Sequence, residues 1–363
     1  MQTSTGKKRI GWIDALRGFT MILVVFSHVE TFGFDLISES GSLNWFFQMF
    51  RMPLFFFVSG FIAYRAGEVW SSDYYKAGVL KKLRVQVIPM LFFAILYACL
   101  IFSPREETAP LESVGLLFND PSKFGYWFTE VLLEMFLIYY TVSFLMRRRK
   151  LASRQIVLAI IAVCFFGLSL LGASTYAKHA VFNWLCIYQL LLYFQFFIFG
   201  NLVSCYRDKV FKMIENPYII GVIILSFFGL HFVNCRIHGV TDNIVVQGLA
   251  KLITEAERYL GVITVLSLFR HYEYFFSSET KIGRGLQYIG QRTLDVYLLH
   301  YFLIPTLPAL GLFFSQTNNL VLEATTGFAL SLLVIVFCLI ISNIIRISPF
   351  LAYWLLGVKR AKE

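Results

Sequence analysis

The sequence predicts an all-α integral membrane protein with about ten transmembrane helices and both termini in the cytoplasm. Three observations support this fold class. Of the 363 residues, 58% are hydrophobic and only 15% are charged, whereas soluble domains average about 25% charged residues. Apolar runs near the length that a membrane-spanning helix needs, about 20 residues, recur along the whole chain. The basic residues gather in alternate loops between these runs, a pattern typical of cytoplasmic loops.

Ten apolar runs are candidate spans: 13–32, 43–64, 85–102, 126–146, 156–173, 184–203, 217–233, 244–269, 294–314 and 324–345. The run 244–269 is the doubtful one because it contains four charged residues. Three of them, Lys251, Glu255 and Arg258, are spaced i, i+4 and i+7. They can pair along one helix face, which lowers their cost within a helix bundle. We interpret residues 1–363 as a single integral membrane domain.

The loop charges predict the orientation. If the N-terminus is cytoplasmic and the runs alternate, the inner segments hold 23 of the 32 Lys and Arg residues and the outer loops hold four. The net charge of +10 is also typical of nucleic-acid binding, but these basic residues flank apolar runs, so we expect no nucleic-acid partner. The six cysteines are scattered and form no CxxC motif, which favours neither a disulfide framework nor a metal site.

A polar stripe follows the first run. Arg17 and His28 are eleven residues apart, which places them within about 20° of each other on a helix and roughly 16 Å apart along its axis. Asp14 lies about 40° to the other side of the same stripe. Because charge is costly in lipid, we expect the stripe to face protein or an aqueous cavity. A functional site is one interpretation; a structural Asp14–Arg17 ion pair with one hydrogen-bonded histidine is the other.

The second run brings Arg51 to a depth similar to that of His28, about 12 Å below the outer surface. A histidine can take a proton from a hydroxyl, and a guanidinium can stabilise an oxyanion. We expect Pro53 to break the helix next to Arg51, and Ser59-Gly60 to loosen it further, so that carbonyls line a cavity. An ordinary kinked helix with a phenylalanine-rich lipid face is the alternative.

Basic residues also precede the third run. Lys81 and Arg84 lie at its cytoplasmic start, where they can bind the phosphates of a bulky anionic donor or anchor the helix at the membrane surface. In the fourth run, Glu130 and Glu134 share a helix face. They either line the cavity, or Glu134 pairs with a cation that the sequence does not identify.

The late run 294–314 brings a second histidine into the membrane. Arg292 and Asp295, at its start, are spaced i, i+3 and can pair, and His300 lies deeper. The four other histidines fall at loop edges, so that we expect them at the surface.

Together these segments resemble the membrane-bound acyltransferase 3 family, which includes sugar O-acetyltransferases of bacterial surface polysaccharides. The family's first helix carries Asp-x-x-Arg-Gly and Arg/Lys-x10-His patterns, matched here by Asp14, Arg17, Gly18 and His28. Its second helix carries Arg-x-Pro-x-Phe-Phe-x-x-Ser-Gly, matched by Arg51, Pro53, Phe56, Ser59 and Gly60.

Two further motifs match and one departs. The family's late Tyr-Leu-x-His is matched by Tyr297, Leu298 and His300. Its Trp-Phe/Tyr-Leu segment is matched by Trp127-Phe128, with Thr129 in place of the leucine. The family's Arg-x-x-Arg is Lys81-x-x-Arg84 here, which keeps the charge but loses one bidentate guanidinium.

The resemblance implies an O-acyltransferase in the bacterial plasma (inner) membrane. It would move an acyl group, usually from cytoplasmic acetyl-CoA, to a hydroxyl of a cell-surface glycan or lipid-linked sugar. It implies His28 as the general base, with an acyl-histidine intermediate as the alternative, and donor binding by Arg17, Lys81 and Arg84. Arg51 and His300 would support catalysis. The expected cavity and structural positions are Asp14, Ser59, Gly60, Glu130, Arg292, Asp295 and Tyr297.

Two rival functions stay open on sequence alone. A secondary transporter or a flippase of lipid-linked glycan also needs buried charges and broken helices, and an inactive relative could serve as a membrane scaffold. The His28 motif and the segment 297–300 favour the enzyme. The acceptor sugar, the acyl chain length and homo-oligomer formation are not determined by the sequence.

Overall fold

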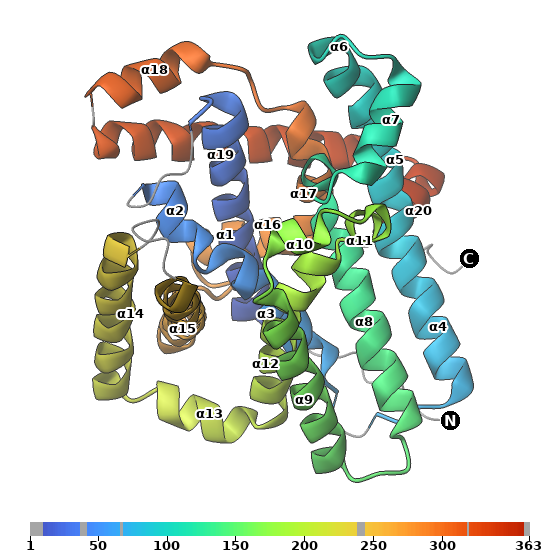
Figure 1. The fold of residues 1–363 in the computed structure, drawn as a ribbon, viewed down its shortest axis with the longest axis vertical. Helices are drawn as coiled ribbons and strands as arrows, with labels where there is room; N and C mark the ends of the chain where they lie inside the picture. The colour runs from blue at the N-terminus through green and yellow to red at the C-terminus, as the bar shows by residue number, and fades with distance from the viewer. Residues whose placement is uncertain (1–9, 37–41, 66–67, 238–243, 318, 359–363) are drawn as a thin grey trace.

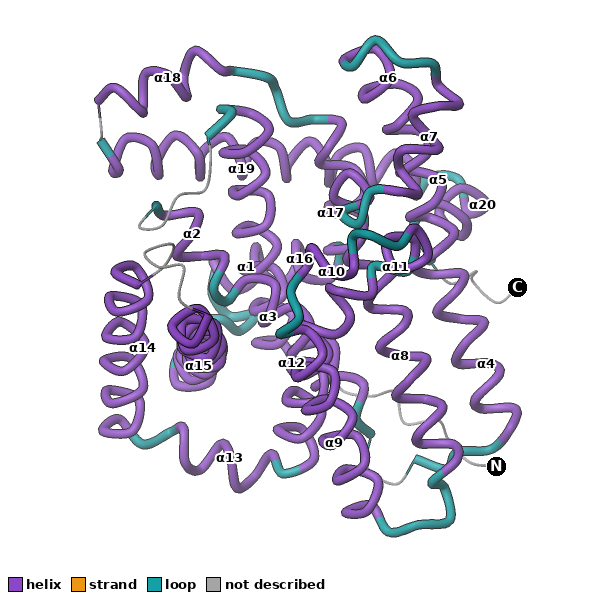
Figure 2. The backbone as a smooth tube through the Cα atoms, in the orientation of Figure 1, coloured by secondary structure: helices purple, strands orange, loops and turns teal. Residues whose placement is uncertain are grey.

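The computed structural model describes residues 10–36, 42–65, 68–237, 244–317 and 319–358. Every regular element in these ranges is helical (Figure 2). The helices are α1 (Gly11–His28), α2 (Leu43–Gln48), α3 (Arg51–Ala63), α4 (Ser72–Lys82), α5 (Ile88–Tyr97), α6 (Ser103–Arg105), α7 (Pro110–Asn119), α8 (Trp127–Leu145), α9 (Leu151–Ser169), α10 (Ala173–Tyr176), α11 (Ala180–Trp184), α12 (Ile187–Cys205), α13 (Arg207–Ile214), α14 (Pro217–Ile237), α15 (Ile244–His271), α16 (Lys281–Gln291), α17 (Thr293–Leu299), α18 (Pro308–Thr317), α19 (Leu320–Ile345) and α20 (Pro349–Leu355). Short 3₁₀ turns cover Lys123–Gly125 and His300–Phe302.

Eight of the described helical segments are long and apolar enough to cross a membrane. They are Gly11–Gly33, Leu43–Ala63, Ser72–Arg105, Trp127–Leu145, Leu151–Ser169, Ile187–Cys205, Pro217–Ile237 and Leu320–Ile345. The chain is therefore an all-α, multi-pass membrane protein, as predicted, and the cytoplasmic location of both termini stays a prediction. α15, the doubtful run, is a single helix of 28 residues, but it is not among these eight segments.

The predicted continuous helix over 294–314 is wrong. α17 ends at Leu299, a 3₁₀ turn follows, and α18 begins only at Pro308. Pro305 and Pro308 account for the break, because a proline lacks the N–H that a helix needs and disfavours helical geometry in the residue before it. The loop between them is held by a hydrogen bond from the backbone N–H of Leu307 to the carbonyl of Gly33, at 2.6 Å.

The second span is also broken, but not at Pro53 as predicted. α2 ends at Gln48 and α3 begins at Arg51, so that the break precedes Arg51. Pro53 falls in the first turn of α3, where a helix does not use the backbone N–H that proline lacks. α3 then continues without interruption through Ser59 and Gly60.

Two pairs of glycines allow helices to pack in backbone contact. A Cβ at Gly18 of α1 would lie 2.0 Å from the carbonyl oxygen of Leu286, and one at Gly290 of α16 would lie 1.7 Å from that of Asp14. α3 and α12 make the same kind of contact, with Gly60 against Phe197 and Gly200 against Phe57. Small residues at such crossings are typical of helix packing in membranes.

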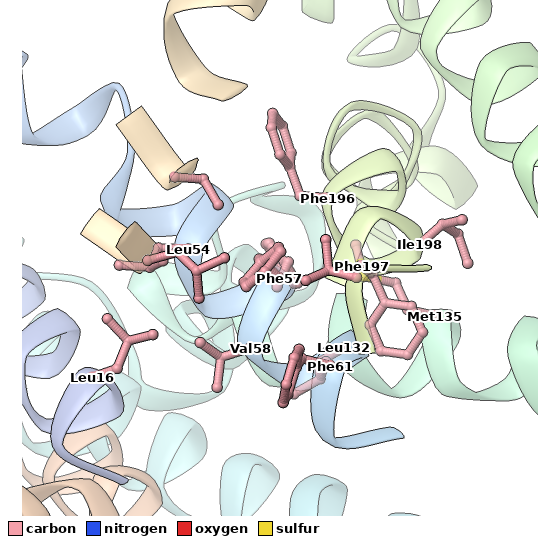
Figure 3. Packing of buried hydrophobic residues seen from close by; sticks show 14 of the residues in the cluster. Leu16, Leu54, Phe57, Val58, Phe61, Leu132, Met135, Phe196, Phe197 and Ile198 are labelled. Atoms are coloured by element: carbon pink, nitrogen blue, oxygen red, sulfur yellow. The ribbon is translucent and has the colours of Figure 1, made fainter. Parts of the chain in front are cut away.

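These crossings place α1 and α3 inside the molecule. α1 lies near the middle of the view in Figure 1, with α4, α5 and α8 to one side and α14 and α15 to the other. Figure 3 shows the hydrophobic core around α3, whose side chains lie between α1 and α12. The core residues labelled there are Leu16, Leu54, Phe57, Val58, Phe61, Leu132, Met135, Phe196, Phe197 and Ile198.

Candidate functional site

A cavity of about 340 Å³ lies between α1, α3, α8 and α17, next to the C-terminal end of α4. It is polar at two places. Arg17 and Lys82 lie toward one end, and His28 and Arg51 lie toward the other, because Arg17 and His28 are separated by three turns of α1. Arg17 and His28 of the polar stripe predicted for the first helix therefore face this cavity, whereas Asp14 does not line it.

His28 forms a pair with the second buried histidine. Its Nδ1 lies 2.8 Å from Nε2 of His300, and the two rings stack with centroids 5.0 Å apart. His300 is fully buried at the end of α17, where the helix gives way to the 3₁₀ turn. The sequence placed both histidines in the membrane, but only the fold brings them into contact.

The surrounding bonds determine which ring nitrogens carry hydrogen. Nδ1 of His300 lies 3.0 Å from the carbonyl oxygen of Val296, which can only accept, so this nitrogen is the donor. In a neutral imidazole the other nitrogen is then an acceptor, so Nε2 of His300 accepts from Nδ1–H of His28. Nε2 of His28 is therefore left with its lone pair, 3.3 Å from the hydroxyl of Tyr301.

Arg51 is positioned by the helix break that precedes it. Its Nη1 donates to Oδ1 of Asn44 in α2, at 2.7 Å. The break lets α2 place Asn44 beside Arg51, although the two residues are seven positions apart. A guanidinium has five N–H donors, so this bond leaves donors that can face the cavity.

Arg17, at the opposite end of the cavity from His28, contacts two partners. It lies 3.7 Å from Asp14, in the i, i+3 pair expected from the sequence. Its Nη2 also donates to the hydroxyl of Thr293 at the start of α17, at 2.7 Å. Arg17 therefore lines the cavity and pairs with Asp14, so the two interpretations of the stripe are not exclusive.

The second cation at this end is Lys82, and neither Lys81 nor Arg84 lines the cavity. The Lys82 ammonium lies 3.2 Å above the ring of Phe136. Arg84 donates to the carbonyls of Tyr353 and Val358, at 3.2 and 3.1 Å, and its guanidinium stacks on the Tyr353 ring. These C-terminal partners hold the Arg84 side chain away from the cavity, and its expected role in donor binding stays a prediction.

The predicted Arg292–Asp295 pair is also wrong. Asp295 pairs with Arg346, the residue that directly follows α19, at 2.5 Å and accepts from the hydroxyl of Ser342 in α19 at 2.6 Å. Arg292 instead stacks on the ring of Tyr288, 3.9 Å from its centroid. The Asp295 carboxylate therefore links α17 to α19 instead of pairing within its own helix.

The other expected cavity residues divide into two groups. Ser59 and Tyr297 line the cavity, and the Tyr297 hydroxyl donates to the carbonyl of Gly125 at 2.9 Å. Gly60 lies at the α3–α12 crossing. Glu130 faces away from the cavity, toward the thiol of Cys186.

Burial and the nearby Glu130 raise the pKa of Cys186. This thiol is therefore a poor nucleophile.

Three residues were not assigned to the site from the sequence, although Lys82 belongs to the basic segment 81–84 that was expected near the donor. Lys82 adjoins Lys81, but a sequence does not say which of two adjacent lysines a helix turns toward a cavity. Thr293 and Tyr301 carry no pattern that would mark them. Their contacts with Arg17 and His28 span more than 270 positions.

One comparison with known proteins identifies the chain. A family model described as an acyltransferase domain, that of the acyltransferase 3 family, matches residues 10–343. This match includes every residue of the cavity. No curated protein and no solved structure was found to match the chain. The chain thus belongs to the acyltransferase 3 family, as its motifs indicated, and is a membrane acyltransferase.

Proposed function

We propose that this acyltransferase moves an acetyl or other short acyl group from cytoplasmic acyl-CoA to a hydroxyl of a cell-surface glycan or lipid-linked sugar. The proposed location is a bacterial inner membrane. The observation that carries the proposal is the His28–His300 pair in the cavity wall, because it leaves the His28 Nε2 unprotonated and able to accept a proton.

The geometry supports direct transfer. The acceptor hydroxyl loses its proton to Nε2 of His28 while its oxygen attacks the thioester carbonyl. The carbon–sulfur bond then breaks, and the thiolate leaves and takes up the proton. The charge that develops on the imidazolium is stabilised by the hydrogen bond between Nδ1–H and His300. His300 thus acts as a positioning residue, as the third member of a catalytic triad does.

Arg51 supplies the second catalytic element. The carbonyl oxygen becomes negative as the acceptor attacks, and a guanidinium in the same cavity can donate to it. The bond to Asn44 fixes Arg51 before substrate binds. No reorganisation is then needed in the transition state.

The cations at the other end suit the donor. Arg17 and Lys82 are three helical turns from His28 along α1, roughly 16 Å, and both groups can bind phosphate oxygens. The thioester of a bound donor would then reach His28 while its phosphates stay near the Arg17 end.

Replacing His28 tests this function. In purified protein, His28→Gln keeps a polar side chain of similar size but cannot take the proton. We expect acetyl transfer to a glycan extract to fall about 10²–10⁴-fold, while calorimetry shows unchanged acetyl-CoA binding. His271→Gln, at an exposed position at the end of α15, is the matched control. Transfer by His28→Gln near the wild-type rate would disprove the base role and return attention to the transporter hypothesis.

A further inference from the structure

A second cavity, of about 510 Å³, lies where α3 and α8 end and α9 begins. Its described lining is strongly basic, with five arginines and one glutamate: Arg65, Arg147, Arg148, Arg149, Arg154 and Glu68. This excess of positive charge over one carboxylate indicates a ligand with several negative charges. Guanidinium groups bind phosphate oxygens in bidentate fashion.

Two buried donors in this lining have no hydrogen-bond partner among the described residues. They are Nε of Arg154 and the indole Nε1 of Trp70. A buried donor left without a partner is unfavourable, so each would be satisfied by an acceptor atom of a ligand. The Trp70 ring is itself fixed between aromatic neighbours, 5.2 Å from the ring of Tyr74 and 5.8 Å from that of Tyr139.

The basic cavity adjoins the catalytic one. Ile62 lines the catalytic cavity and Tyr64, two residues later, lines the basic cavity. An aromatic wall also joins them. Phe136, beneath the Lys82 ammonium, contacts Tyr140 at 5.7 Å, and Tyr140 contacts Trp70 at 5.3 Å. The two cavities are therefore neighbours along α3 and α8, close enough for one extended ligand to place groups in both.

We propose that the arginine-lined cavity binds the 3′-phosphoadenosine end of the acyl-CoA donor. This inference rests on the proposed function, and it extends the donor site beyond Arg17 and Lys82. Acyl-CoA carries its negative charge in two places, a pyrophosphate and a 3′-phosphate. The pyrophosphate would lie at Arg17 and Lys82, and the 3′-phosphate would lie among the arginines of the second cavity. This arrangement explains how the chain binds the donor although Arg84 is held by the C-terminal segment.

Truncated donors test the site directly. KM is measured in lipid nanodiscs for acetyl-CoA, for its 3′-dephospho form and for acetyl-pantetheine, with wild type, Arg154→Gln and the double variant Arg148→Gln/Arg149→Gln. We expect each variant to raise KM for acetyl-CoA about ten- to a hundredfold and to leave KM for acetyl-pantetheine unchanged. The control variant Lys209→Gln removes an exposed charge on α13. It should leave KM unchanged for both acetyl-CoA and acetyl-pantetheine.

Two outcomes would overturn the proposal. One is an unchanged KM for acetyl-CoA in folded Arg148→Gln/Arg149→Gln. The other is a change of KM in the variants that depends on phosphatidylglycerol in the nanodisc rather than on the form of the donor. That result would assign the cavity to a phospholipid headgroup. Calorimetry with CoA and 3′-dephospho-CoA needs no acyl transfer, so a failure of the proposed reaction can be distinguished from a failure of this site. Arg154→Lys, which keeps the charge, identifies effects of misfolding.

Discussion

At the scale of single residues, the proposed function depends on one nitrogen atom, Nε2 of His28. A backbone carbonyl at Val296 fixes the hydrogen on His300, and His300 fixes the hydrogen on His28. The result is a proposed base whose lone pair faces the Tyr301 hydroxyl and does not depend on a charged partner. A carboxylate would serve the same purpose at a higher cost of burial in a membrane protein, whereas a neutral histidine that bonds to a carbonyl carries no charge.

His300 can be tested separately from His28. His300→Phe removes the acceptor of the His28 bond, and a buried donor left unpaired costs about 1–3 kcal/mol. We therefore expect kcat to fall roughly five- to a hundredfold with KM for acetyl-CoA unchanged. His300→Gln, whose amide oxygen can accept the same bond, should restore part of the rate. Equal rates for His300→Phe and wild type would show that the pair has no catalytic role.

Lys82 and Arg84 should differ in their effect on the donor. Lys82→Gln removes a cation that lines the catalytic cavity, and a charge-assisted phosphate contact is worth about 1.5–3 kcal/mol. KM for acetyl-CoA should rise roughly ten- to a hundredfold. Arg84→Gln should leave this KM unchanged and loosen the C-terminal segment, measured as faster proteolysis after Val358. The opposite result would place the donor phosphates at Arg84.

At the scale of elements, the site depends on how closely α1 approaches α16. Gly18 and Gly290 let the two backbones touch, which brings Thr293, just after α16, to Arg17. π-helical turns begin directly after His28 and after Lys82, at Val29–Gly33 and Leu83–Val87. Such turns are frequent at functional sites because they rotate the following residues out of register with the preceding helix. A π-helical turn therefore lies at each end of the cavity.

The α1–α16 contact makes a prediction with an internal control. Gly290→Ala would place a methyl group against the Asp14 carbonyl, and overpacking of this kind costs about 1–3 kcal/mol or more. We expect a lower unfolding temperature in detergent and a loss of acyl transfer. Gly285→Ala lies on the same helix with nothing within 4 Å, so it should be neutral or stabilising by up to about 1 kcal/mol. Equal behaviour of the two variants would contradict the crossing.

At the scale of the whole molecule, the question is how many segments cross the bilayer. The predicted count of about ten includes α15 and 294–314, whereas eight segments of the described part of the chain qualify by length and composition. Either count is even, so both leave the two termini on the same side. The two counts place the segment 272–280 on opposite sides of the membrane, because this segment is cytoplasmic only if α15 crosses.

Reporter fusions can settle this topology. The loop charges predict that fusions after Lys150, Glu279 and Lys362 read cytoplasmic and that one after Asp120 reads external, because basic residues mark the inner loops. An external reading after Glu279 together with a cytoplasmic C-terminus would mean that neither α15 nor 294–314 crosses. In that case His300 would reach His28 from a segment that enters the membrane and returns.

The sequence by itself determined the fold class, the family and both histidines. Apolar runs and loop charges are local properties, and a helix face follows from spacing alone, so the spacing of Arg17 and His28 is enough to place them on one side of α1. Pro305 and Pro308 also indicated a break in the helix, although the run 294–314 was predicted to be continuous.

Only the tertiary structure decided the partners. Asp295 was expected to pair with Arg292, three residues away, but it pairs with Arg346. Arg84 was expected at the donor and instead binds the C-terminal segment. In each case the partner lies more than 50 positions away in the sequence, and the choice depended on which helices pack together. Such long-range contacts leave no mark in a single sequence, because neither partner's neighbours reveal where its helix will pack.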